Sequence, residues 1–123
     1  MTDISEHRYG IEERQRQLAE LVASLRALIP VVAETPQVSH LTIAYEQAMA
    51  QATALLHAGL RQEELSALSR SVPDIVSRHK DWMPPLEQEK DGSWREAPWF
   101  TNIEPLLQPV LKAAGLLRVL GYY

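Results

Sequence analysis

The chain has 123 residues, of which 46% are apolar and none is cysteine, and its formal net charge is −4. This length and composition predict a single domain spanning residues 1–123, which folds without a metal or a disulfide. The lack of cysteine excludes disulfide scaffolds, thiolate zinc sites, iron–sulfur clusters and cysteine nucleophiles. The acidic balance disfavours nucleic acid as a partner, because phosphate backbones repel an acidic surface.

The first ten residues, MTDISEHRYG, contain no basic region followed by an apolar run, so we expect no secretory signal peptide. No stretch of about eighteen apolar residues occurs, so we also expect no membrane span. These features, together with the absence of cysteine, lead us to expect a cytoplasmic protein.

The first expected helix covers residues 5–28. Its apolar stripe recurs at seven-residue spacing, at Ile4, Ile11, Leu18, Leu25 and Val32, which is typical of a helix that packs along one face. The stripe is weaker in the first half, where the second position of the stripe holds His7 and Arg14. Pro30 is expected to end the helix. The length of the helix and its polar first half favour a homodimer.

Four more helical stretches are expected further along the chain. Residues 39–58 carry an alanine-rich apolar stripe between an N-cap at Ser39 and a C-cap at Gly59. Residues 61–70 are expected to form a shorter helix that is broken near Pro73. A short further helix is expected to start at Ser71, which has capping-box spacing to Asp74, and to run to about Lys80. The last helix covers residues 106–120, with Pro109 near its start because proline is poorly tolerated in a helix interior.

Residues 81–102 are expected to be irregular, since they are interrupted by Pro84, Pro85, Gly92 and Pro98. All three tryptophans and the only phenylalanine of the chain lie here, at Trp82, Trp94, Trp99 and Phe100. Two interpretations remain open. The segment either plugs one end of the helices, chiefly through Trp82, Trp99 and Phe100, or forms an interaction surface. That surface would consist of Trp82, Trp94, Arg95, Trp99 and Phe100, because tryptophan and arginine dominate binding hot spots. Trp94 is the aromatic that we expect to be exposed.

The predicted fold class is therefore all-α. The expected architecture is a bundle of four main helices, with the third kinked or broken and an irregular aromatic-rich segment before the C-terminal helix. The burial of leucine, isoleucine, valine and alanine stripes is expected to stabilise it.

Catalytic and metal-binding patterns are missing from the sequence. The four histidines, at positions 7, 40, 57 and 79, lack the spacing of three or four residues that a helical metal site needs. No Gly-x-Ser-x-Gly elbow and no phosphate-binding glycine loop occurs. We therefore expect no cofactor, no metal and no enzymatic activity. A Ser–His–acid triad assembled across helices would nevertheless leave no trace in the sequence.

One stretch resembles a known family. Residues 55–68, LLHAGLRQEELSAL, are similar to the first two helices of repressor-type helix-turn-helix domains, in which a glycine precedes a Gln-Glu-Glu-Leu helix. The resemblance implies that Arg70, Ser77, Arg78 and Lys80 would face DNA. The chain departs from the family at Arg70, where a glycine is usual, and at Pro73, which would fall near the start of the recognition helix.

Three functions remain open. The first is a non-enzymatic helical interaction or accessory protein that binds a protein partner or a second copy of itself. The second is a helix-turn-helix DNA-binding protein that uses residues 55–80. The third is a small-molecule-binding helical bundle with a pocket near His79 and Trp82.

Overall fold

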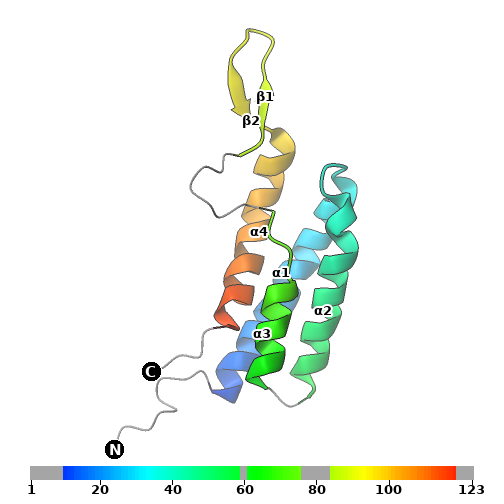
Figure 1. Ribbon diagram of the computed structural model, residues 1–123, viewed down its shortest axis with the longest axis vertical. Coiled ribbons are helices and arrows are strands. Elements are labelled where there is room, and N and C mark those ends of the chain that lie inside the picture. The colour runs from blue at the N-terminus through cyan, green and yellow to red at the C-terminus, as the bar shows by residue number, and fades with distance from the viewer. Residues whose placement is uncertain (1–9, 59–60, 76–83, 119–123) are drawn as a thin grey trace, which may run out of the picture.

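The computed structural model describes residues 10–58, 61–75 and 84–118 (Figure 1). This part of the chain is mostly helical, which confirms the expectation of a chiefly helical protein, but it also contains a small two-stranded sheet. The elements are helix α1 (Ile11–Glu34), the short 3-10 helix η2 (Ser39–Leu41), helices α2 (Thr42–Leu56), α3 (Gln62–Ser71) and α4 (Pro98–Leu116), and strands β1 (Leu86–Gln88) and β2 (Trp94–Glu96).

Successive helices run in opposite directions along the long axis of the molecule (Figure 1). Helix α1 packs against α2 and α4, and α3 packs against the same two helices, but α3 and α4 are in looser contact than α1 is with either neighbour. All four helices contribute to one hydrophobic core. Its largest fully buried members are Leu18, Leu21, Leu25, Leu28, Val32, Tyr45, Leu65, Leu68, Ile103, Leu107 and Leu117.

Helix α1 does not end before Pro30, as the sequence suggested, but continues to Glu34. Leu28 and Val32 lie one turn apart on the buried stripe, so continuing the helix adds apolar burial. Pro30 lies on the exposed face, where the carbonyl group that loses its helical donor can be hydrated. Ile11, which shares the expected heptad spacing, is 69% exposed and is therefore not part of the core.

Helix α4 begins at Pro98, eight residues earlier than expected, and it includes Pro105 and Pro109. Proline at the first position of a helix loses no hydrogen bond, because that N–H has no helical acceptor. The two internal prolines are exposed, whereas Phe100 and Ile103 on the opposite face are buried. The buried stripe therefore starts at Phe100, and the free energy gained by burying these side chains exceeds the cost of the two internal prolines.

The aromatic-rich segment is more regular than the sequence suggested, because residues 86–96 form a β-hairpin. Helix α3 ends at Ser71, and Val72 has an extended backbone (φ −77°, ψ 118°). The short helix expected from Ser71 to about Lys80 does not start where the sequence suggested, because residues 72–75 are not helical and Pro73 disfavours the α conformation at Val72. Residues 76–80 of this expected helix lie outside the described residues. No helix in the described ranges is long and apolar enough to span a bilayer.

Candidate interaction surface

The hairpin β1–β2 extends beyond the N-terminal end of α4, away from the other helices (Figure 1). The strands are antiparallel, with Leu86 opposite Glu96 and Gln88 opposite Trp94. At the base of the hairpin, the Ala97 N–H donates a 2.7 Å hydrogen bond to the carbonyl oxygen of Pro85. Because Ala97 is also the N-cap of α4, this bond ties the hairpin to the helix.

The loop of the hairpin has the geometry of a tight three-residue connection. The Glu89 N–H donates to the Ser93 carbonyl over 2.7 Å, and the Gly92 N–H donates to the Glu89 carbonyl over 3.0 Å. Gly92 has a φ of +92°, a conformation that glycine adopts without the steric cost of a side chain. Such a turn, closed by glycine with positive φ, is a common hairpin connection.

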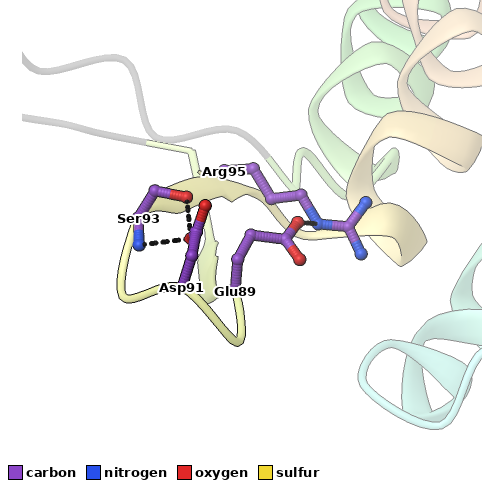
Figure 2. A network of polar contacts seen from close by, with 4 residues as sticks. All are labelled: Glu89, Asp91, Ser93 and Arg95. Carbon is purple, nitrogen blue, oxygen red and sulfur yellow. Dashed lines mark hydrogen bonds and ion pairs between the residues drawn. The ribbon is translucent and has the colours of Figure 1, made fainter.

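Side chains reinforce this loop (Figure 2). Asp91 Oδ1 accepts hydrogen bonds from the Ser93 N–H at 2.9 Å and from the Ser93 hydroxyl at 2.6 Å. These two bonds stabilise the carboxylate and lower the pKa of Asp91 below its ordinary value of 3.8. The guanidinium of Arg95, on β2, forms an ion pair with Glu89. The network fixes the loop although all of its residues lie near solvent.

The two faces of the hairpin differ in chemistry. Directly paired residues share a face of a sheet, so Leu86, Gln88, Trp94 and Glu96 lie on one face, and Glu87 and Arg95 lie on the other. Trp94 is 62% exposed and its diagonal neighbour Leu86 is 42% exposed. The hairpin therefore presents two large apolar side chains on one face, and Trp94 is exposed as the sequence predicted.

The other aromatic candidates are placed differently. Phe100 is 0% exposed, and Trp99 is half-buried against the core. Their rings meet edge to face, with centroids 5.9 Å apart and an interplanar angle of 87°. Trp99 also lines a shallow depression of about 540 Å³ together with Glu34 and Thr35 at the end of α1. Phe100 thus packs inside the protein and does not contribute to the surface.

A buried polar cluster at the opposite end of the helices escaped the sequence analysis. Arg14, 5% exposed, donates hydrogen bonds to Gln17 Oε1 at 2.8 Å, to the Leu116 carbonyl at 2.8 Å and to Gln62 Oε1 at 2.6 Å. Gln62 Nε2 in turn donates to the Leu117 carbonyl at 2.8 Å. In the sequence, Arg14 occupies a position of the apolar stripe of the first helix, and this position indicates that its side chain faces the core. The cluster joins α1, α3 and α4.

A second buried polar group connects α2 to the end of α3. Tyr45, 0% exposed, donates a 2.8 Å hydrogen bond from its hydroxyl to the carbonyl oxygen of Pro73. Burial and, to a smaller extent, the negative charge of Asp74 raise the pKa of Tyr45 above its usual value. The hydroxyl is therefore held protonated as a donor and is not poised as a catalytic base.

The two remaining hypotheses rest largely on residues outside the described ranges. His79 and Trp82 of the expected pocket lie there, as do Ser77, Arg78 and Lys80 of the expected DNA-binding surface. Arg70 is described and lies exposed near the end of α3, beside α4. The described residues include no group of three or more histidine, aspartate or glutamate side chains that could hold a metal ion.

Comparison with known proteins adds no assignment to this geometry. No protein-family model matches the chain, and neither the curated proteins nor the solved structures provide a match.

Proposed function

We propose that the chain is a non-enzymatic interaction protein in which the helices form a bundle that carries the hairpin β1–β2 as its binding element. The observation that carries this proposal is the exposure of Trp94 beside Leu86 on one face of a hairpin that lies outside the helical core. A lone two-stranded hairpin is only marginally stable in water. Here the loop network and the bond from Ala97 to Pro85 hold it in place before any partner binds.

The proposed partner is a protein with an apolar pocket surrounded by basic side chains. Residues 86–96 carry four carboxylates and two basic side chains, a net charge of −2. This charge complements a basic rim, and it disfavours nucleic acid as the partner. Trp94 would fill the pocket as the anchor of the interface, since a partly exposed tryptophan buries a large area on binding. A cytoplasmic location is part of the same proposal.

The test begins with a photo-crosslinking amino acid at position 88 of the full chain in its native host, because Gln88 is exposed directly opposite Trp94 and its replacement leaves the tryptophan in place. A matched probe at position 43 on α2 is the control, because Ile43 is 66% exposed but lies outside the hairpin. The crosslinked protein is then purified, and its affinity for the chain is measured. We expect Trp94→Ala to weaken binding by about 30-fold, as for a hot-spot residue, and Ile43→Ala to leave it unchanged.

Three outcomes would contradict the proposal. The first is the absence of any adduct specific to position 88. The second is equal affinity of the Trp94→Ala variant and the unmodified chain for the purified partner. The third is an adduct of twice the mass of the chain, which would favour the homodimer that the first helix suggested over a heterologous partner.

A further inference from the structure

A cleft lies between α3 and α4, on a different part of the molecule from the hairpin. Its volume is about 900 Å³, which is within the range of small-molecule binding sites. The loose contact between α3 and α4 opens it. Its apolar part includes Val72 at the end of α3 and Leu111 and Ala114 on α4. The cleft can therefore accommodate the apolar body of an organic ligand.

The charged side chains of the cleft are mostly basic. Arg70, Lys112 and Arg118 line it together with one carboxylate, that of Asp74. The local net charge is thus +2, whereas the whole chain carries −4. Lys112 lies on α4, and Arg118 follows the last turn of that helix. Because the acidic excess lies elsewhere, the cleft is a positively charged region that attracts anions.

Ser69 lies in the wall of the cleft, beneath its surface. It is 7% exposed, and its hydroxyl is buried and has no hydrogen-bond partner within the described ranges. Because this oxygen has almost no accessible surface, a ligand in the cleft does not reach it. An unpaired buried hydroxyl is destabilising, so Ser69 affects the stability of the chain and not the recognition of the anion.

We propose that the α3–α4 cleft binds a small organic anion with an apolar body and a carboxylate or phosphate head. The head pairs with the basic side chains of the cleft, and the apolar body packs against Val72, Leu111 and Ala114. This site is separate from the hairpin and does not depend on its proposed role. Trp94→Ala is therefore expected to leave anion binding unchanged.

The test titrates the isotope-labelled chain with decanoate, decyl phosphate, decanol and inorganic phosphate, and follows the backbone amide resonances. We expect saturable shifts of the Ser69, Leu111 and Gly115 amides with at least one of the two amphiphilic anions. The relative affinity of decanoate and decyl phosphate then distinguishes a carboxylate site from a phosphate site. The neutral alcohol should bind at least tenfold more weakly, since charge-assisted hydrogen bonds are lost. Inorganic phosphate should also bind more weakly, because it lacks the apolar body.

Substitutions distinguish binding of the anion in the cleft from nonspecific attraction of anions to the protein. The double substitution Arg70→Gln and Lys112→Gln should weaken anion binding at least tenfold. Arg26→Gln, an exposed arginine on α1, should change it by less than about twofold. Ser69→Ala should leave anion binding nearly unchanged, because a ligand in the cleft does not reach the hydroxyl. By removing an unpaired buried hydroxyl, it should raise the thermal midpoint of the ligand-free chain or leave it unchanged.

Several results would overturn the inference. They are no saturable binding of either amphiphilic anion, equal binding of decanol, shifts that map outside the cleft, or unchanged affinity in the double variant. Binding of inorganic phosphate as tightly as the amphiphiles would likewise reject the apolar half of the site.

Discussion

Arg14, near the start of α1, donates a 2.8 Å hydrogen bond to the carbonyl oxygen of Leu116 in the last turn of α4. The last carbonyls of a helix lack helical donors, and a positive charge is favourable at this end of the helix dipole. Gln62, at the start of α3, accepts from the same guanidinium and donates to the next carbonyl, that of Leu117. One arginine therefore links the ends of three helices that are distant in sequence.

Replacing Arg14 by lysine should destabilise the protein by about 1–3 kcal/mol, because an ammonium cannot reproduce the forked donors that reach Gln17, Gln62 and Leu116 at once. The matched control is Arg26→Lys on the exposed face of α1, which should change the free energy of unfolding by less than about 0.5 kcal/mol. Urea denaturation monitored by circular dichroism measures both. Equal effects of the two substitutions would contradict a structural role for the Arg14 cluster.

Tyr45→Phe should cost about 1 kcal/mol near neutral pH, because the Pro73 carbonyl loses its donor. Because the pKa of Tyr45 is raised, the free energy of unfolding should also depend on pH in the alkaline range. Its stabilising contribution is complete below the ordinary tyrosine pKa near 10 and is lost as the pH rises above it. The free energy of unfolding should then fall by up to about 1.4 kcal/mol per pH unit. Denaturation from about pH 8 to about pH 11 should show this extra slope in the unmodified chain but not in the variant.

Ser93→Ala should raise the pKa of Asp91 toward its ordinary value, because the carboxylate loses the hydroxyl donor at 2.6 Å. The hydrogen bond from the Ser93 N–H remains, so the pKa should stay below that of an unassisted aspartate. An NMR titration of the Asp91 carboxyl carbon measures the shift, and the same titration of the unmodified chain provides the reference. An unchanged Asp91 pKa in the variant would show that the loop network does not hold the carboxylate in solution.

Two glycines should respond to alanine in opposite directions. Gly115, inside α4, has no atom within 4 Å of an added Cβ, so Gly115→Ala should stabilise the protein by about 0.5 kcal/mol. Gly92 also has open space, but its φ of +92° strains any other residue. Gly92→Ala should therefore destabilise the hairpin by about 1–2 kcal/mol. Denaturation measures the first effect, and amide exchange of the Glu89 N–H measures the second. Stabilisation by both substitutions would contradict the hairpin geometry.

The sequence by itself determined the helical character of the chain, because apolar side chains at helical spacing have a low free energy when they collapse together. It also indicated that Trp94 would be exposed, since polar and small residues surround it. The same periodicity already contained the correct start of α4, in the spacing of Phe100, Ile103 and Leu107. The nearby prolines favoured a later start, because each proline disfavours a helix locally. Burial of Phe100 and Ile103 compensates for that cost.

Only the tertiary structure decided where the prolines are tolerated and which polar groups are buried. Pro30, Pro105 and Pro109 remain within helices because packing places each of them on a solvent-facing surface. The burial of Arg14 depends on the carbonyl group of Leu116, more than a hundred residues away, and the cleft beside Ser69 depends on how loosely α3 meets α4. The spacing of residues within one segment predicts whether that segment forms a helix and which of its faces is buried. The tolerated prolines, the buried arginine and the cleft depend instead on contacts between segments that only folding brings together.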